Sequence, residues 1–467
     1  MSTATLTRPE APATDERFRW APLLVVLAGT FVTFLDFFIV NVALDSIGAQ
    51  LHAGAGTVQL IVAGYALSFA VGMISGGRLG DLYGRRRMFS IGLALFTLMS
   101  LTCGLAPNAE VLVTARILQG AAGALLTPQV LAILSSVYPG RWLPRAFAGY
   151  GFAMGIAGVL GQLIGGALIS ADVLGGWRAI FLINVPVGVV ILPLVRRVLP
   201  ESRGGRARLD GLGTALITLT LTAVVLPLVE GRQYGWPLWS WLSFAAAPVL
   251  LAAFVGHQRR RDLAGRAPLV HLGLFADGRF RIGSLAGLTF GLVPAAFFFV
   301  LALYLQAGRG FSPVFSGVVF TAVGVGYFLA MVLAAGVEAR LGRQVLALGS
   351  LAVGLGCVLL AVAPSAGPSA ELVPGLALIG FGIGLVLVPL SQTVLADVEP
   401  AHVGAAAGVL ATAQQVGGGL GVAVIGVVFF DAAGRGLVHA FTVSLWVLAA
   451  LTLGTAALVQ ALPRKGR

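Results

Sequence analysis

The stretch GGRLGDLYGRRRMF, Gly76–Phe89, decides how the rest of this chain is interpreted. It is a short polar turn between two long apolar runs, and it combines spaced glycines, one carboxylate and three consecutive arginines. Glycine lets two helix ends approach closely in a tight turn. The carboxylate, Asp81, can accept hydrogen bonds from Arg85 or Arg86, or from the N-terminus of a nearby helix. We therefore interpret the stretch as a turn between two membrane-spanning helices rather than as an ordinary basic loop.

The composition favours a membrane protein. Only 10% of the 467 residues are charged and 58% are hydrophobic, whereas a soluble globular protein carries about 25% charged residues. The apolar runs are roughly 18 to 25 residues long, which is the length that an α-helix needs to cross a bilayer. A transmembrane β-barrel would show shorter, alternating segments. The predicted fold class is therefore all-α and polytopic.

Hydrophobic length and the positions of helix-breaking residues predict fourteen membrane spans. The first six are Trp20–Leu44, Val58–Gly76, Met88–Ala106, Val111–Tyr138, Ala146–Ser170 and Trp177–Leu199. Two more are Gly211–Val229 and Leu238–Gly256. The last six are Ile282–Gln306, Phe315–Gly336, Val345–Val362, Leu372–Leu395, Val403–Phe430 and Leu437–Leu462.

The basic residues predict how the spans are oriented. Nearly all of them fall in loops on one side of the predicted membrane; Arg116 lies inside a span, and the other side holds only Arg178, Arg232, Arg309 and Arg435. Cytoplasmic loops carry such an excess. We therefore predict cytoplasmic N- and C-termini and a multi-pass protein of the cell (inner or plasma) membrane. The net charge of +12 sits in short loops between spans, which argues against a nucleic-acid partner.

Four regions follow from the order of the spans. They are a cytoplasmic tail at 1–19, an N-terminal six-helix bundle at 20–200, two inserted helices with flanking basic loops at 201–278, and a C-terminal six-helix bundle at 279–467. Equal six-helix halves are typical of a transporter. No cofactor or metal site is predicted, because the five His residues are scattered without ligand spacing. Cys103 and Cys357 fall inside spans, so no disulfide is expected.

Gly76–Phe89 resembles the signature loop of the major facilitator superfamily, and a weaker copy, GVEARLGRQ at Gly336–Gln344, stands in the matching turn of the second half. The resemblance implies the major facilitator fold: two six-helix bundles, here with two extra central helices. It also implies that the loop gates conformational exchange. The residues that would carry this role are Gly77, Gly80, Asp81, Gly84, Arg85 and Arg86.

Further motifs resemble the fourteen-helix drug:proton antiporters of that superfamily. FLDFFIVNVAL, Phe34–Leu44, is similar to their first-span motif, except that Phe38 replaces a threonine. GVLGQLIGGAL, Gly158–Leu168, is similar to their fifth-span motif G-P-x-x-G-G, except that Gln162 replaces the proline. Three more stretches resemble the same family: TARILQGAAGALLTPQ (Thr114–Gln129), WRAIFLINVPVG (Trp177–Gly188) and AAGVLATAQQVGGGLGVAV (Ala406–Val424).

Asp36 is an ionisable residue placed deep inside an apolar span, where an unpaired charge costs several kcal/mol. At 1.5 Å per residue it lies about 6 Å from the outer edge of the membrane core, and Arg116 lies about 9 Å from that edge. The first and fourth spans are neighbours in the superfamily's fold. We hypothesise that Asp36 and Arg116 face one cavity, directly or through Gln119 or water, and couple proton uptake to transport. The alternative is a static ion pair that joins two helices.

Other polar and small residues inside spans are weaker candidates. Substrate-cavity candidates are Asn41, Gln119, Gln162, Gln414 and Gln415, each of which could instead join helices by hydrogen bonds. Gly158, Gly161, Gly165 and Gly166 of the antiporter-like motif are predicted to be close-packing positions. Phe297, Phe298 and Phe299 could form an aromatic wall, although a lipid-facing position is favoured.

The function predicted is export of lipophilic or cationic small molecules, such as drugs and antibiotics, in exchange for protons by alternating access. Because Asp36 is the only acid placed well inside a span, we expect a neutral or amphiphilic substrate at least as much as a cationic one.

A proton-coupled symporter or a uniporter on the same fold remains an alternative, and an integral-membrane enzyme is disfavoured because no paired carboxylates or G-x-S-x-G motif occur. A P-loop is excluded because the only lysine is Lys465. A monomer is expected.

Overall fold

A computed structural model describes residues 19–138, 142–202, 210–232, 234–266, 268–363, 369–395, 398 and 403–462. Residues 1–18 of the predicted cytoplasmic tail lie outside the described part. The described chain is helical throughout its spans, and fourteen helical segments are long and apolar enough to cross a membrane. The prediction of an all-α, fourteen-span protein is therefore confirmed.

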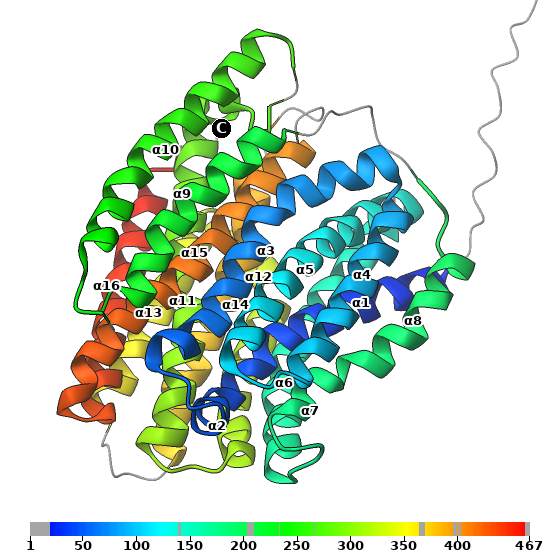
Figure 1. The fold of residues 1–467 in the computed structure, drawn as a ribbon. Helices are drawn as coiled ribbons and strands as arrows, with labels where there is room; N and C mark the ends of the chain where they lie inside the picture. Colours follow the sequence, from blue (N-terminus) through cyan, green and yellow to red (C-terminus); the bar gives the residue numbers. More distant parts are fainter. Residues whose placement is uncertain are drawn as a thin grey trace, which may run out of the picture.

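The helices follow the predicted order (Figure 1). The N-terminal half holds α1 (Trp20–Ile39), η1 (Val40–Ala43), α2 (Leu44–Gln50), α3 (Ala55–Tyr83), α4 (Arg85–Gly104), α5 (Ala109–Val137), α6 (Leu143–Ser170), α7 (Arg178–Leu182) and α8 (Asn184–Val198). The inserted pair is α9 (Gly211–Glu230) and α10 (Leu238–Leu263). The C-terminal half holds η3 (Leu272–Ala276), α11 (Gly278–Leu303), the π-turn η4 (Tyr304–Gly308), α12 (Pro313–Leu341), α13 (Gln344–Val362), η5 (Ser369–Leu372), α14 (Val373–Leu395), α15 (Val403–Ala432), η6 (Ala433–Arg435) and α16 (Leu437–Gln460).

Several helices continue beyond the spans that hydropathy predicts. Helix α3 runs to Tyr83 and α10 to Leu263, each about two turns past the predicted end. Hydropathy marks only the part that crosses lipid, whereas the backbone keeps its i→i−4 hydrogen bonds in water as well. The sixth span is divided at Ile183 into α7 and α8.

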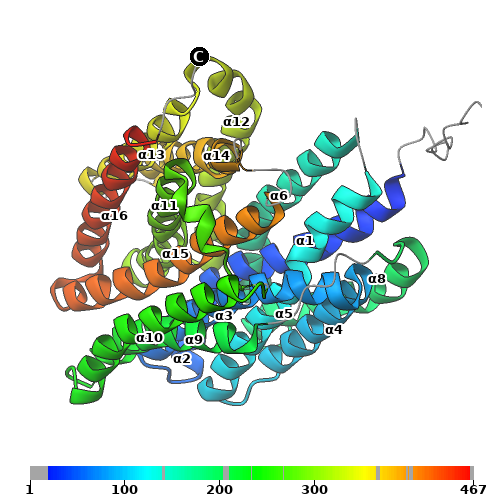
Figure 2. The same ribbon diagram turned by 90° about the horizontal axis from the view of Figure 1, so that it is seen from above.

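The two halves lie side by side, and Figure 2 shows α11, α13, α14 and α16 grouped away from α1, α4, α5 and α8. Two helix pairs join the halves: α3 packs against α15, and α6 packs against α12. The inserted helices α9 and α10 pack against each other along one edge of the molecule, where α9 contacts both α3 and α15. The interface between the halves is therefore formed mainly by α3, α6, α12 and α15.

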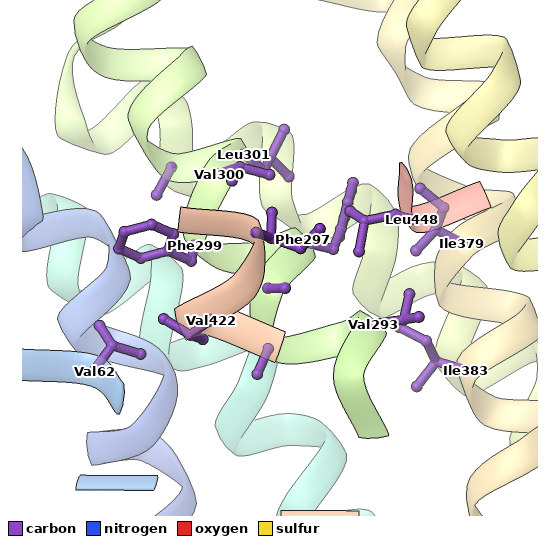
Figure 3. Close-up of a cluster of buried hydrophobic side chains, with 14 of the residues drawn as sticks. Val62, Val293, Phe297, Phe299, Val300, Leu301, Ile379, Ile383, Val422 and Leu448 are labelled. Carbon is purple, nitrogen blue, oxygen red and sulfur yellow. The ribbon is translucent and has the colours of Figure 1, made fainter. Parts of the chain in front are cut away.

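The core of the C-terminal half is built around α11 (Figure 3). Phe297, Phe299, Val300 and Leu301 are fully buried there, beside Val422 of α15. Because lipid tails are as apolar as these side chains, their burial stabilises the fold through van der Waals packing rather than through removal from water. The favoured lipid-facing position for Phe297 and Phe299 is therefore wrong. Three consecutive residues of a helix point in different directions, and in α11 none of the three phenylalanines points toward lipid.

Candidate functional site

Asp36 of α1 and Arg116 of α5 form an ion pair inside the N-terminal half. Arg116 Nη1 lies 2.5 Å from Asp36 Oδ2, and the two side chains are 1% and 0% exposed. The two residues whose depths agree in the sequence are therefore in direct contact. A pair so completely removed from water must be held by further hydrogen bonds to be tolerated.

Three polar side chains supply these bonds. Gln119 Nε2 and Asn184 Nδ2 each donate to Asp36 Oδ1 at 2.9 Å. Arg116 Nη1 also donates to Gln119 Oε1 at 2.8 Å. Ser100 Oγ accepts from Gln119 at 3.1 Å and from Asn184 at 2.9 Å, and donates to the Phe181 carbonyl. The network joins α1, α4, α5 and α8 into one polar core.

Tyr65 of α3 closes this network on one side. Arg116 Cζ lies 4.1 Å from the centroid of the Tyr65 ring, a cation–π distance. Arg116 Nε also donates to the carbonyl of Ile61, one turn earlier in α3, at 3.3 Å. The Tyr65 hydroxyl is buried and has no hydrogen-bond partner among the described atoms. The Tyr65 ring therefore contacts Arg116 of the ion pair, while the Tyr65 hydroxyl forms no hydrogen bond among the described atoms.

A cavity of about 270 Å³ lies between the halves. Helices α1, α3, α5 and α6 line it from one side, and α11, α12, α14 and α15 from the other. Its aromatic lining residues are Phe34, Phe37, Phe38, Tyr65, Phe69, Tyr150, Phe290, Phe298, Phe320 and Tyr327. No lining residue in the described part of the chain is charged. The cavity is therefore an aromatic site with a few neutral polar groups.

The predicted cavity residues divide into two groups. Gln162, Gln414 and Gln415 line the cavity. Gln119 belongs to the buried ion-pair network, and Asn41 Nδ2 donates to the carbonyls of α1 at 3.0 and 3.4 Å. These two residues are not among the described lining residues, and neither are Asp36 and Arg116. The expectation that the ion pair faces the cavity directly is therefore corrected: Tyr65 is the side chain that touches both.

The glycines of the antiporter-like motif bring α6 close to two neighbours. Gly158, Gly161 and Gly165 face α1, where added Cβ atoms would lie 2.6–3.4 Å from Phe38, Leu35 and Ile39. Gly166 faces α12 of the other half, and its added Cβ would lie 2.4 Å from the Pro313 carbonyl oxygen. A larger residue at 166 would push the halves apart at this contact.

The signature loop is fixed by short-range contacts. Arg85 Nη2 lies 3.1 Å from Asp81 Oδ1, and Gly84 adopts a φ of 104° at the turn between α3 and α4. Gly77 packs on Pro128, and Gly80 lies against Gln129, whose amide donates to the Gly76 carbonyl at 2.7 Å.

The segment that leaves the sixth span is bound to the same loop. Glu201 Oε1 accepts from the Arg86 backbone N–H at 3.1 Å, and the Arg85 backbone N–H donates to the Ser202 carbonyl at 2.9 Å. A carboxylate at the start of α4 interacts favourably with the helix dipole. The loop and the beginning of the insert therefore form one unit.

The end of the insert is bound to α3 as well. Arg78 donates to the Pro268 carbonyl, and to that of Leu269 at 3.3 Å. Gln258 of α10 accepts from the Leu269 and Val270 backbone N–H groups at 2.5 and 3.2 Å, and donates to Asp210 at 2.8 Å.

Asp210 precedes α9 and is buried. Burial alone would raise the pKa of this carboxyl, but hydrogen bonds from His257, the Gly213 N–H and Gln258, with the nearby Arg261 charge, lower it to about 2. Asp210 is therefore ionised at every physiological pH. It accepts hydrogen bonds from both inserted helices and so holds them together.

The halves are bonded to each other at the end of the molecule opposite the signature loop. Gln59, near the start of α3, donates to the Val422 and Ala423 carbonyls of α15, each at 2.8 Å. Gln306 of η4 donates to the Val42 carbonyl of the N-terminal half at 2.8 Å. These bonds hold the two halves together at that end.

The sequence reasoning missed Ser100, Asn184 and Tyr65. Asn184 gave a usable signal, because it is a polar residue within the apolar stretch WRAIFLINVPVG. Ser100 and Tyr65 gave none, because serine and tyrosine are common inside spans for packing reasons. Among the described residues, no group of three His, Cys, Asp or Glu side chains could hold a metal ion.

Comparisons with known proteins agree with this architecture. The family model of the Major Facilitator Superfamily matches residues 26–422. The chain is 40% identical over 423 residues to a probable actinorhodin transporter of Streptomyces coelicolor, covering 89% of this chain and 73% of that protein. It is 35% identical to a puromycin resistance protein of Streptomyces alboniger, covering 95% and 91% of the two chains.

A solved structure of an auto-inhibited POT family peptide transporter shares the fold. Its TM-score is 0.69 at 14% sequence identity, with 96% of this chain and 97% of that chain covered. The matched family consists of transporters, not enzymes, and its curated relatives include drug and antibiotic efflux proteins. This chain therefore belongs to the major facilitator superfamily, as a multi-pass, fourteen-span transporter of small molecules.

Proposed function

We propose that this protein exports lipophilic small molecules, antibiotics among them, from the cytoplasm in exchange for protons by alternating access. The names of its relatives, a transporter of one antibiotic and a resistance protein for another, support export. The observation that carries proton exchange is the fully buried Asp36–Arg116 pair, which lies beside the cavity-lining residue Tyr65. An ionisable pair inside a membrane protein marks a proton or substrate pathway by default.

The network would keep Arg116 partnered in both protonation states of Asp36. When Asp36 is ionised, Arg116, Gln119 and Asn184 all donate to it. When it takes a proton, Arg116 loses its counter-charge but keeps two acceptors, Gln119 Oε1 and the Ile61 carbonyl, as well as the face of Tyr65. A buried guanidinium with such partners is far less costly than an isolated one.

Tyr65 provides a route from the cavity to the pair. Its ring stacks on Phe69 at 6.0 Å and contacts Phe37, and all three residues line the cavity. A substrate that stacks on these rings displaces Tyr65 from Arg116, and a shift of Arg116 changes how strongly Asp36 holds its proton. Substrate binding in the cavity and proton binding at Asp36 then compete through Tyr65, although the two sites are separate.

The arrangement supports an inward-facing state. The halves are bonded at the end opposite the signature loop, so that end would face outward with the termini in the cytoplasm. Exchange to the other state would break the Gln59 and Gln306 bonds and move α6 past α12 at Gly166. The loop residues Gly77, Gly80, Asp81, Gly84, Arg85 and Arg86 would gate this motion at the cytoplasmic end.

The inserted helices would move with the N-terminal half. Their leading segment is bonded to the signature loop through Glu201 and Ser202, and their trailing segment to Arg78. In this proposal residues 20–200 and 201–278 form one body and residues 279–467 the other. The transporter would work as a monomer in the cell membrane.

Substrate-induced proton release tests the function. Purified protein in weakly buffered liposomes would receive ethidium, puromycin or 2-aminoanthraquinone while the external pH is recorded. The wild type should release protons with at least one compound, and Asp36→Asn should release none. Proton uptake together with the compound would instead indicate symport, and transport with no proton movement would indicate a uniporter.

A further inference from the structure

Two residues that depart from the antiporter motifs, Phe38 and Gln162, are in contact. Gln162 Nε2 of α6 donates to the Phe38 carbonyl of α1 at 3.0 Å. The Phe38 ring lies against Gly158, one turn before Gln162, at 3.4 Å from the position of an added Cβ. The first-span and fifth-span departures therefore form a single feature of the structure.

Both residues line the cavity between the halves. The Phe38 ring meets Phe298 of α11 edge to face, with centroids 5.4 Å apart. Phe298 in turn stacks on Phe320 of α12 at 5.8 Å. Phe38 is thus the N-terminal half's contribution to an aromatic surface that crosses to the other half. A threonine at this position would leave the surface incomplete.

Gln162 adds an unused acceptor beside that surface. The Phe38 carbonyl fixes the amide orientation, because only the NH₂ group can donate to it. The Gln162 carbonyl oxygen is then left buried without a partner in the described structure, and the side chain is only 1% exposed. An unsatisfied buried acceptor is costly, and a ligand that donates to it recovers that cost. A proline at this position would offer no such group.

We propose that Phe38 and Gln162 form a specificity-determining pair that selects flat, uncharged aromatic compounds with a hydrogen-bond donor at the ring edge. The inference rests on the proposed export function and names the substrate class of the same cavity. A permanently cationic compound has no counter-charge on the described cavity wall, and burying an unpaired charge is strongly unfavourable. A neutral planar donor meets both the rings and the Gln162 oxygen.

Binding without any gradient tests the pair. Purified protein in nanodiscs is titrated with 2-aminoanthraquinone and anthraquinone, which differ only in one amino group, and with ethidium, a flat aromatic cation. The wild type should prefer the amino compound over anthraquinone by up to about tenfold, the size of one hydrogen bond. Ethidium should bind most weakly of the three.

Two substitutions at Gln162 should remove the preference between the anthraquinones. They are Gln162→Leu and Gln162→Pro. The second introduces the proline of the antiporter motif, so the test can still be made if the leucine variant fails to fold. Phe38→Thr should weaken both anthraquinones about equally, by roughly three- to tenfold. Phe147→Leu, on the same helix at a 38% exposed position outside the described cavity lining, should change neither affinity.

Tightest binding by ethidium would overturn the inference, as would a donor preference that survives in both Gln162 variants. Proton release, measured on the same preparations, separates this result from the proposed function. Proton release with ethidium and no anthraquinone preference would leave the export function standing and reject the pair. The predicted binding pattern without any proton release would retain the pair and reject proton exchange.

Discussion

The two halves of the molecule share one helical plan but differ in what they bury. The third span of each half carries a buried cysteine. Both belong to the large apolar cluster, but Cys103 Sγ also lies 3.6 Å from Gln119 Oε1 of the ion-pair network. In the described part of the C-terminal half, no Asp or Glu is buried. In the proposed mechanism one half therefore holds the titratable pair, and the other half takes part through the cavity between them.

Asp36→Asn should break this asymmetry most severely. Removing the carboxylate removes the only buried acid of the described N-terminal spans, so proton-coupled export should fall to background. The variant should also be less stable, because a buried charge left without its partner costs about 3–5 kcal/mol of folding free energy. For Arg116 the cost is smaller, because its side chain keeps other hydrogen-bond acceptors. Export from liposomes and thermal unfolding measure the two effects. Asp45→Asn, at an exposed site in α2, is the matched control, and undiminished export by Asp36→Asn would refute the coupling scheme.

A disulfide between the halves should have the next largest effect. An added Cβ at Gly419 of α15 would lie 3.7 Å from the Leu67 Cβ of α3, a spacing that suits a disulfide. Oxidising Leu67→Cys/Gly419→Cys should stop transport, and reduction should restore it. An added Cβ at Gly354 of α13 would lie 3.7 Å from the Thr452 Cβ of α16, within one half and outside the described cavity lining, so Gly354→Cys/Thr452→Cys should transport equally in both redox states. Transport by the oxidised first variant would show that the halves need not separate there.

The amino-acid sequence was sufficient for the fold because each span is long and apolar, and arginines lie beside most of them. The contact between Asp36 and Arg116 followed from their matching depths together with the family resemblance, which implied that the first and fourth spans are neighbours. Depth along a helix follows from the rise of 1.5 Å per residue, so an error of one or two residues moves a side chain by only about 3 Å.

The direction in which a side chain points is far less predictable, because it turns by about 100° with each residue. This explains why Asn41, Gln119 and the ion pair were expected in the cavity and lie elsewhere. It also explains why Phe297 and Phe299 were assigned to lipid. Tyr65 and Ser100 acquire their importance only from neighbours on other helices, which no local pattern records.

Asp81→Ala should have a moderate effect, confined to rate. The Asp81–Arg85 pair is partly exposed, at 38% and 23%, and such pairs contribute little to stability. We expect exchange between the two states to slow by about two- to fivefold, with substrate affinity unchanged. Counterflow rates and equilibrium binding distinguish these quantities. Lost binding with a normal exchange rate would contradict a gating role for the loop.

Asp210→Asn should have the smallest effect, and it tests how strongly the two inserted helices are held to each other. The pKa of Asp210 is lowered to about 2 in the folded protein, below its usual value near 4. The ionised carboxylate therefore stabilises the fold fully above about pH 4, and that contribution is lost as the pH falls toward 2. The melting temperature should drop by about 1–3 °C, by the same amount at pH 5 and at pH 8. A difference that grows between these two pH values would point to His257 instead.

The uncharged lining of the described cavity has an energetic consequence. If the cargo is neutral, it carries no charge across the bilayer, and each exchanged proton alone moves with the electric field. A membrane potential of 100 mV then contributes about 2.3 kcal/mol per cycle. With one proton per molecule, that is enough for a concentration ratio of about fortyfold. A cell could thus keep such compounds out on voltage alone, even where the pH is equal on both sides.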